Sequence, residues 1–453
     1  MSEIVYQIWL LLEQVLSSVP IGTNLCLLCL LFALLSGRFL SSRGAVFPAL
    51  LELGLCKETV RRSEAALCYG SWCIADLLGD WQTSVLAQGA WQPHSYEGIR
   101  PVPCDLTGFF RPELAGCCGK HYQSVAGKAL PAVVFALVGA VVFALVGAVG
   151  SVGKMRLALP RLILRQQPSE TNEGALQKRA VRSAAETLAP EEALILDAGF
   201  GVQELFECEV PRFVVRVAKN FTARRNEVPE RKPRGRPVEY GEVVRPLART
   251  RSGKTIAATK PDEKTSWKEG KRTVRAHIWS NLILSDQKPG AKAFGCVAIL
   301  DPRYKEPLLL VHYGLSVSAR SVRELYRDRW PIEKLPQAAK QMLGAERAFV
   351  FGKESRYRLP ELALRAGNIL SFVAARCAPV ASGFWDRAAR PTGGRLRRLL
   401  ARQDFSKLPF AQGKLRKKAS VTEHLPKGVI GHRRTKAVQQ PTCRPNFTAF
   451  TGN

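Results

Sequence analysis

The sequence predicts an α/β protein, in which a mixed sheet flanked by helices is preceded by a helical domain and interrupted by a β-rich insertion. Three observations predict this class. Leucines recur at helical spacing through residues 1–95, with few β-branched runs. Between 96 and 210, short apolar runs of strand type are followed by a helical pattern. From 211 to 305, β-type segments alternate with basic loops rich in glycine and proline.

The strand pattern returns at PLLLVHYGLS and is followed by a long helical pattern, SARSVRELYRDRWPIEKLPQAAKQML. We therefore divide this part of the chain into residues 96–210, a basic β-rich segment at 211–305, and residues 306–375; the resemblance described below implies that the first and third are two parts of one core. Residues 376–453 form a basic C-terminal region. Within it GRLRRLLARQDF predicts one amphipathic helix, and the tail is expected to be disordered.

The charge balance indicates an anionic partner. The chain has 453 residues, with 67 Lys and Arg against 38 Asp and Glu, a formal net charge of +29. Basic residues recur over 210–275, 319–329 and 387–435, which favours a long polyanion over one small ligand. The loop PRGRP contains Arg234 and Arg236. It is interpreted either as a minor-groove hook or as a loop that contacts phosphates.

A second candidate DNA-binding element lies near the N-terminus. ALLELGLCKETVRRSEAALC (49–68) predicts a helix, a short turn with glycine and a second helix. Thr59 is expected to cap the second helix and to place Arg61 and Arg62 on its first turn. This pattern is typical of a helix-turn-helix, and equally of a helical hairpin with a solvated basic face.

The cysteines predict a reducing compartment and no structural zinc. Twelve of them are scattered without a framework, and the N-terminus has no secretory signal. Cys26 and Cys29 form a CxxC without a second pair. Cys117, Cys118 and His121 lack a fourth ligand.

Two acids and one helix carry the candidate chemistry. The strand-like runs GIRPVPCDLTGFF and EEALILDAGFG contain Asp105 and Asp197. An acid at the end of a buried strand is costly unless it is hydrogen-bonded or holds a cation. One such Asp is usually a cap or turn residue, but two in one chain prompt a search for a third acid. Tyr326, Arg329, Glu333 and Lys340 fall within about 60° of one helix face. The alternative for this stripe is an Arg–Glu pair on a solvated face.

These four residues match the spacing Tyr-x2-Arg-x3-Glu-x6-Lys, and the chain resembles bacterial insertion-sequence transposases of the DDE type, in the IS-four group. CDLTGFF, LDAGFG and YRDRWPIE are similar to that family's motifs, and the resemblance spans roughly 90–375. It implies an RNase H-like core split by the insertion. Asp105, Asp197 and Glu333 would be the catalytic acids and would hold Mg²⁺, with Mn²⁺ as a substitute.

The resemblance also implies partners. Tyr326, Arg329 and Lys340 would contact phosphates of double-stranded DNA at the element ends, and a dimer is expected on DNA. The location would be the bacterial cytoplasm, at the nucleoid. Trp267 and Trp279 are candidates to stack on a displaced base, although strand core is the better interpretation for Trp279. Pro336 is expected to kink the helix between Glu333 and Lys340.

One segment departs from the family. In ALPAVVFALVGAVVFALVGAVGSVG (129–153) the octapeptide AVVFALVG occurs twice, at 132–139 and 140–147. The segment is long enough to span a bilayer. We expect instead that one copy pairs in the sheet, and that the other overhangs, bends at Gly139 or Gly147, or becomes helical.

Three hypotheses remain open at this point: an active DNA transposase, an inactive relative that only binds DNA, and an integral membrane protein with two spans.

Overall fold

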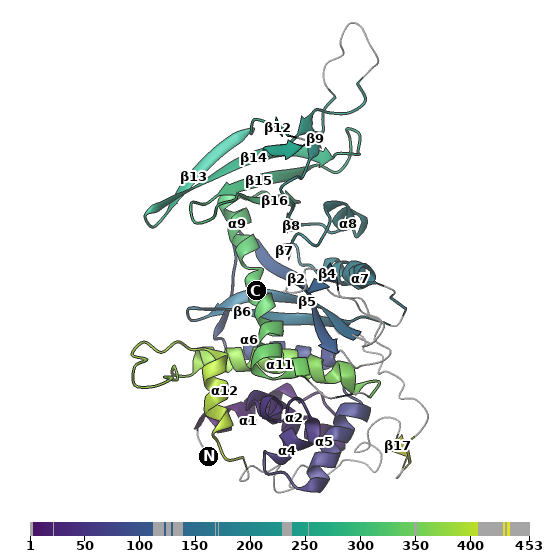
Figure 1. Cartoon of the computed structure of the whole chain (residues 1–453), viewed down its shortest axis with the longest axis vertical. Coiled ribbons are helices and arrows are strands. Elements are labelled where there is room, and N and C mark those ends of the chain that lie inside the picture. The colour runs from purple at the N-terminus through teal and green to yellow at the C-terminus, as the bar shows by residue number, and fades with distance from the viewer. Residues whose placement is uncertain are drawn as a thin grey trace. The chain divides into compact units, whose positions relative to one another are not determined.

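The computed structural model divides the chain into two compact units, each described here by itself. The first comprises Met1–Pro93, Leu106–Gln177 and Pro331–Gly452, and the second His94–Asp105 and Lys178–Trp330. The structure describes residues 3–20, 22–111, 122–123, 128–129, 139–167, 169–170, 172–228, 238–251, 253–347, 350, 352–405, 429–430 and 433–434. Over these residues the architecture is mixed α/β, with an open sheet flanked by helices (Figure 1).

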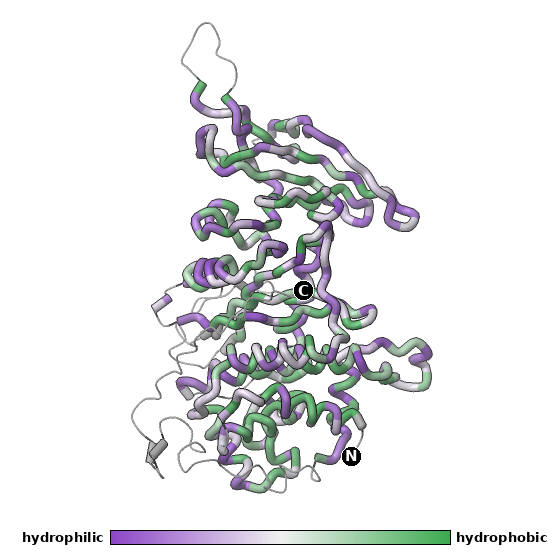
Figure 2. Tube along the Cα trace, turned by 180° about the vertical axis from the view of Figure 1, so that it is seen from behind, coloured by the Kyte–Doolittle hydropathy of each residue, from purple (hydrophilic) through white to green (hydrophobic). Residues whose placement is uncertain are grey.

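Helices dominate the N-terminal part of the first unit, as the leucine spacing predicts. They are α1 (Glu3–Val15), the 3₁₀ helix η1 (Gly22–Cys26), α2 (Leu27–Leu35), α3 (Arg38–Ser41), α4 (Val46–Leu51), α5 (Lys57–Tyr69) and α6 (Ile74–Ala87). Figure 2 shows hydrophobic segments, in green, mixed with hydrophilic ones, in purple, in this part of the chain, and every residue of α2 is buried. Among the described helices, none is both long and apolar enough to cross a bilayer.

The long helix α11 (Ser355–Arg376) joins these helices to the strands of the first unit. Trp81 of α6 is fully buried and donates from its indole nitrogen to Oδ1 of Asn368, at 2.7 Å. Asn368 in turn donates to the carbonyl of Ala158, at 2.6 Å. Phe372 contacts the Trp81 ring edge-on, with centroids 5.3 Å apart. One buried contact set therefore connects two helices and a strand.

The strands of the first unit include the repeat. β5 (Gly139–Val152) pairs antiparallel with β6 (Met155–Arg165), and its other neighbours are β1 (Trp91–Pro93) and β2 (Arg100–Arg111). The second copy of AVVFALVG lies within β5, so one copy is paired as expected. Residues 132–138 lie outside the described residues.

The pairing of β5 has one irregularity. Val146 faces Leu162 and Gly147 faces Pro160, so Arg161 is the extra residue. It lies beside Gly147, one of the two glycines at which a bend was expected. A Cβ at Gly147 would lie 2.8 Å from the carbonyl oxygen of Leu159. The strands therefore approach closely where the second copy ends.

In the second unit the sheet order is β2-β7-β8-β16-β15-β14-β9-β10, with β13 beside β14. β7 is parallel to β2 and to β8, and the described pairings from β8 onward are antiparallel. The basic β-rich segment therefore extends the sheet that begins with β2 and β7. The bounds are β7 (Glu192–Leu196), β8 (Phe213–Arg216), β9 (Ala223–Arg225), β10 (Val243–Val244), β13 (Glu263–Glu269), β14 (Arg272–Leu284), β15 (Phe294–Leu300) and β16 (Leu308–Tyr313).

The remaining elements are short or connect these strands. They are the helices α7 (Glu173–Glu186), α8 (Val202–Glu207), α9 (Ala319–Arg327), α10 (Trp330–Gln337), α12 (Gly393–Ala401), the π-helix η2 (Ala338–Met342) and the 3₁₀ helix η3 (Ala345–Arg347), and the strand pairs β3 (Tyr122–Gln123) with β4 (Lys128–Ala129), β11 (Arg249–Arg251) with β12 (Lys254–Ile256), and β17 (Val429–Ile430) with β18 (Arg433–Arg434).

A cluster of ion pairs fixes α9 to the extended part of the sheet. Arg323 of α9 is 2% exposed; it donates to Asp301 at 2.6 Å and is also paired with Glu269 of β13. Arg303 donates to the same Asp301 carboxylate, at 2.6 Å. This hydrogen bond to Arg303 holds the pKa of Asp301 well below its usual range. Arg323 likewise lowers the pKa of Glu269.

The cluster predicts a stability loss in acid. A carboxyl whose pKa is lower in the folded chain contributes stability that is complete above its unfolded pKa, about 4, and is lost as pH falls through the folded value. The free energy of opening β13–β15 is therefore expected to be constant from pH 7 to about 5 and to fall below about 4. Hydrogen exchange of peptides from these strands measures it. Asp301→Asn should flatten the decline, and replacing the exposed Asp286 by Asn should not; equal profiles for all three proteins would contradict the prediction.

Candidate functional site

Asp105 and Asp197 lie at corresponding positions, just beyond the paired residues of two neighbouring parallel strands. Pro103 of β2 faces Ile195 of β7. The two acids stand two residues further along: Asp105 is still in β2, and Asp197 comes directly after the end of β7. Neighbouring strands are about 4.8 Å apart. Both side chains are half-buried. Residues 92 positions apart in the sequence are thus neighbours at one edge of the second unit.

Local sequence explains this placement. All five residues of β7 are buried, which is typical of a strand covered on both faces. After Asp197 the chain turns sharply, with the amide of Phe200 donating to the Asp197 carbonyl at 3.1 Å, and α8 begins after Gly201. The acid therefore stands in the loop after a parallel strand, where α/β proteins usually position functional groups.

Helix α9 covers this part of the sheet and brings Tyr326 to Asp197. Val322, Leu325 and Tyr326 pack with Ile195 and Val214 in one buried cluster. The Tyr326 hydroxyl donates to Oδ1 of Asp197 at 3.1 Å. Burial raises the pKa of Tyr326, although the nearby Arg329 acts in the opposite direction. The phenol therefore stays protonated and remains a donor at neutral pH.

Two arginines complete the surroundings of Asp197. Nη2 of Arg329 is 3.8 Å from Oδ2, and Nη1 of Arg216 is 3.9 Å from Oδ1. The Arg329 side chain is 4% exposed and its guanidinium also lies over the rings of Tyr326 and Trp330. The Arg216 side chain is 50% exposed. One carboxylate thus has a phenol donor, a buried cation and a cation that solvent can reach.

The expected single helix from Tyr326 to Lys340 is wrong. Helix α9 ends at Arg327, α10 runs from Trp330 to Gln337, and a π-helix follows. The first break coincides with Asp328, which is fully buried and accepts hydrogen bonds from Nδ1 of His94 at 2.6 Å and from the hydroxyl of Tyr96 at 2.8 Å. The second follows Pro336, which has no N–H for a helical bond, as the expected kink requires.

The structure brings together only part of the predicted set. Asp105, Asp197, Tyr326 and Arg329 belong to the second unit, whereas Glu333 and Lys340 belong to the first. Glu333 is half-buried on α10. The ammonium group of Lys340, on the π-helix, lies 5.1 Å from the ring centroid of Phe109 in β2. A π-helical turn is rare and often occurs at functional positions.

Sequence reasoning missed three contributors to this region. Arg216 ends β8, the strand next to β7, so the strand order is the signal that identifies it. Burial raises the pKa of the Cys104 thiol, and the negative charges of Asp105 and of Glu204 in α8 raise it further, so Glu204 lies near the same strand end. His94 has no comparable signal, since its partner Asp328 lies 234 residues away.

The remaining candidate DNA contacts lie in the helical pair at 49–68 and in the PRGRP loop, and the structure describes only the first of these. Helix α5 begins at Lys57 after Cys56, so Thr59 is inside the helix and is not its cap. Arg61 is exposed on α5 and Arg62 is half-buried, in the second turn rather than the first. Helices α4 and α5 pack together, which suits both a helix-turn-helix and a hairpin. The loop with Arg234 and Arg236 lies outside the described residues, as do Cys117, Cys118 and His121.

The two tryptophans that were candidates for base stacking differ in burial. Trp279 is fully buried in β14 and donates to the carbonyl of Lys260 at 3.1 Å, so it is strand core, as expected. Trp267 is half-buried in β13, and the guanidinium of Arg323 lies 5.9 Å from its ring centroid. Of the two, only Trp267 keeps an accessible surface.

Within the described residues, no three His, Cys, Asp or Glu side chains are grouped so that they could hold a metal ion together. Asp105 and Asp197 are the two predicted ligands that the second unit contains. Their carboxylate oxygens are the hard donors that Mg²⁺ and Mn²⁺ prefer, so the donor chemistry fits these ions.

No protein-family model and no curated protein matches the chain.

Proposed function

We propose that the protein is a DNA transposase, which cuts and joins DNA at the ends of an insertion sequence with the help of divalent metal ions. One observation carries the proposal: Asp105 and Asp197 stand at corresponding positions, just beyond the paired residues of two adjacent parallel strands, with Tyr326 and Arg329 directed at Asp197. Four residues that the family signature and motifs single out from the sequence therefore converge at one strand end.

The proposed catalytic core is RNase H-like, with the β-rich segment as its insertion. Two features support it. The acid-bearing strands β2 and β7 are parallel neighbours, as convergence of the acids requires. The strands that follow β8 in the sheet come from the segment assigned to the insertion and from β16 after it. The resemblance adds Glu333 of α10 as the third acid.

The proposed cofactor is Mg²⁺, with Mn²⁺ as a substitute, bound by the carboxylates of Asp105, Asp197 and Glu333. When bound, such ions activate the attacking water or 3′-hydroxyl and stabilise the leaving oxygen. The protein's own side chains would orient the metal-binding carboxylate and neutralise the charge of DNA phosphates. Tyr326 fixes one Asp197 oxygen by its hydrogen bond, and Arg329 is held in place by two aromatic rings. Arg216 is exposed enough to reach a DNA phosphate.

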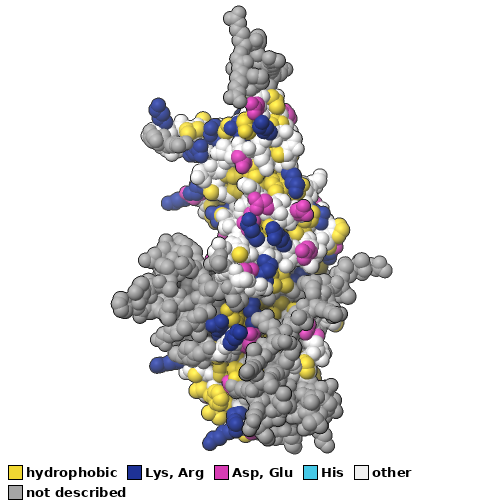
Figure 3. Space-filling model, turned by 90° about the vertical axis from the view of Figure 1, so that its right-hand side faces the viewer, with side chains coloured by type: hydrophobic (Ala, Val, Ile, Leu, Met, Phe, Trp, Pro, Cys, Tyr) yellow, Lys and Arg dark blue, Asp and Glu magenta, His cyan; other side chains and the backbone are white. Residues whose placement is uncertain are grey.

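The proposed partner is double-stranded DNA, namely element ends and target, bound by a dimer in the cytoplasm at the nucleoid. The formal charge of +29 supports it. Lys and Arg side chains occur at many points of the described surface (Figure 3). Tyr326, Arg329 and Lys340 would act near the cleaved end, and Arg61, Arg62, Arg234 and Arg236 would add contacts elsewhere.

An inactive relative that only binds DNA is the second candidate. The observation that favours it is the duplicated AVVFALVG, which enlarges the chain next to β5.

Cleavage separates the two candidates. A supercoiled plasmid that carries the chromosomal sequences flanking the coding region is incubated with the full-length protein and Mg²⁺. The transposase should convert it to nicked and linear forms with breaks at the element ends, and chelation by EDTA should stop the conversion. Binding of the flanking sequences without breaks in Mg²⁺ or Mn²⁺ would support the inactive relative, and absence of binding would contradict both.

A further inference from the structure

The loop between α11 and α12, residues 377–392, presents two aromatic side chains to solvent. Phe384 is 94% exposed and Trp385 is 68% exposed. The loop projects beside α12 in Figure 1. The rings of Phe384 and Trp385 contact each other edge-on, with centroids 5.1 Å apart. Two adjacent aromatic residues with this exposure form an apolar surface that has no partner within the described part of the chain.

The loop is held in shape by its own contacts. Asp386 accepts from the amide of Ser382 at 2.9 Å and from Nη2 of Arg395, in α12, at 2.6 Å. The amide of Asp386 donates to the carbonyl of Gly383 at 3.0 Å. A Cβ at Gly383 would lie 2.5 Å from the Trp385 ring, so only glycine lets the ring lie there. The two rings are therefore presented by a tethered turn.

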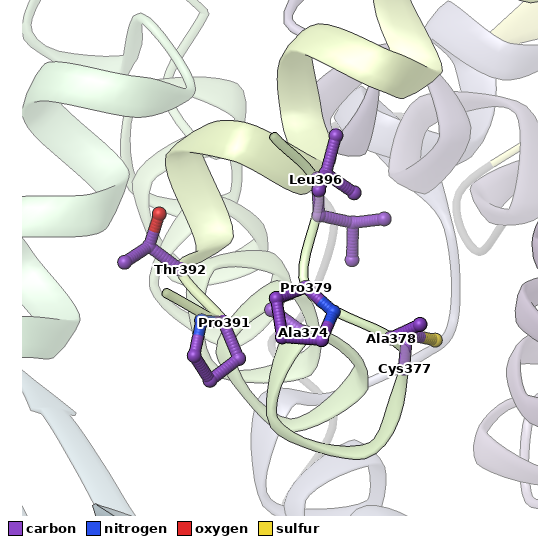
Figure 4. A pocket seen from close by; sticks show the side chains of 8 residues that line it. Ala374, Cys377, Ala378, Pro379, Pro391, Thr392 and Leu396 are labelled. Atoms are coloured by element: carbon purple, nitrogen blue, oxygen red, sulfur yellow. The ribbon is translucent and has the colours of Figure 1, made fainter. Parts of the chain in front are cut away.

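At the base of the loop lies a small, open apolar hollow, lined by Pro379, Pro391 and Leu396 among others (Figure 4). Two prolines restrict the backbone where the loop leaves and rejoins the helices. A restricted loop loses less conformational entropy when it binds a partner, which favours recognition by the exposed tip.

The charged residues beside Phe384 and Trp385 indicate which kind of partner would bind there. Arg387 and Arg390 are exposed in the same loop. The single acid of the loop, Asp386, is neutralised by Arg395. The accessible surface thus combines aromatic faces with positive charge. Nucleic acid offers the matching combination of phosphates and flat bases, and base–aromatic stacking contributes about 1–3 kcal/mol per base. In a duplex the base faces are covered, so the match is to unpaired bases.

We propose that the loop 377–392 binds single-stranded nucleic acid, with unpaired bases stacked on Phe384 and Trp385 and phosphates paired with Arg387 and Arg390. This binding does not depend on the cleavage reaction proposed above, and its test uses no metal ion.

The test is fluorescence anisotropy with the full-length protein in EDTA, using a labelled 15-nucleotide strand, the same strand with abasic positions, and the corresponding duplex. The double variant Phe384→Ala/Trp385→Ala should bind the strand about 10- to 100-fold more weakly than the unmodified protein, consistent with stacking of one or two bases. It should bind the duplex and the abasic strand as the unmodified protein does. The matched control is Tyr304→Ala, which removes another exposed aromatic side chain, 64% exposed, outside the loop.

Three outcomes would overturn the proposal. One is unchanged affinity of the double variant for the strand. Another is an equal loss for strand and duplex, which would indicate a loss of charge steering or folding. The third is a change in sedimentation coefficient of the double variant without a change in strand affinity, which would assign the aromatic surface to contact with a second copy. The double variant Arg387→Ala/Arg390→Ala should weaken strand binding. It should also make the slope of log affinity against log salt concentration shallower, by the amount expected for the loss of about two phosphate contacts.

Discussion

Replacing Asp197 by alanine is expected to abolish DNA cleavage, by about 10³-fold or more, while DNA binding is retained. Asp197 lies beside Asp105 by register and accepts from Tyr326, so its loss removes one of the proposed metal ligands. Loss of a group that acts as part of a catalytic unit typically costs several powers of ten. Binding should persist because the substitution leaves Arg216 and Arg329 without their shared carboxylate, which makes the site more positive.

The measurement is the rate of plasmid nicking in Mg²⁺, together with electrophoretic mobility shifts at the same salt concentration. Asp197→Asn should behave as the alanine variant, since an amide is a poor ligand for Mg²⁺ but keeps the shape. Asp286→Ala removes an exposed acid of the same unit and should cleave normally. Full activity of Asp197→Asn would refute the assignment, and so would a loss of binding that parallels the loss of cleavage in a variant with normal thermal unfolding.

Trp81→Ala is expected to lower the free energy of unfolding of the first unit by about 3–5 kcal/mol. The indole is fully buried, packs edge-on against Phe372 and donates to Asn368. Its removal leaves a cavity and also deprives Oδ1 of Asn368, itself buried, of its donor. A domain is typically stable by only 5–15 kcal/mol, so this one change removes a large part of the total.

Urea unfolding followed by circular dichroism measures the effect without relying on tryptophan fluorescence. Trp81→Phe keeps most of the buried area and loses the N–H, so it should cost about 1–2 kcal/mol. The control Trp385→Ala replaces a tryptophan that is 68% exposed and should change stability by less than about 0.5 kcal/mol. Similar midpoints for Trp81→Ala and Trp385→Ala would show that the buried contact set does not limit the stability of this unit.

The sequence predicts those features that depend on local pattern. The strands around Asp105 and Asp197 follow from apolar runs, whereas the hydrogen bond between Tyr326 and Asp197 is a tertiary contact that the sequence analysis did not predict. The break after Arg327 could not be predicted in this way. It coincides with the burial of Asp328, whose partners His94 and Tyr96 lie more than 230 residues away. No periodicity within the helix records such a partner.

Other differences have the same origin. Thr59 is a good capping residue by type, but α5 begins earlier because the turn from α4 is short and Cys56 is extended. Trp279 is strand core, as expected for a large aromatic residue in a β-type segment, and its side chain is fully buried in β14. β14, β15 and β16 pair with their neighbours in the sequence, but their connection to β8 depends on the pairing of β16 with a strand far earlier in the chain, which composition does not encode.

The tandem octapeptide AVVFALVG can be lost by deletion without changing the residues of β5 that pair with β6. Because the two copies are identical, deleting residues 132–139 and deleting residues 140–147 produce one and the same polypeptide. In that shorter chain every residue of β5 that pairs with β6 keeps its identity, from the phenylalanine now at 143 to Val152. The duplication is therefore reversible by a single in-frame loss of eight codons, and the revertant provides an isogenic reference for the cleavage assay.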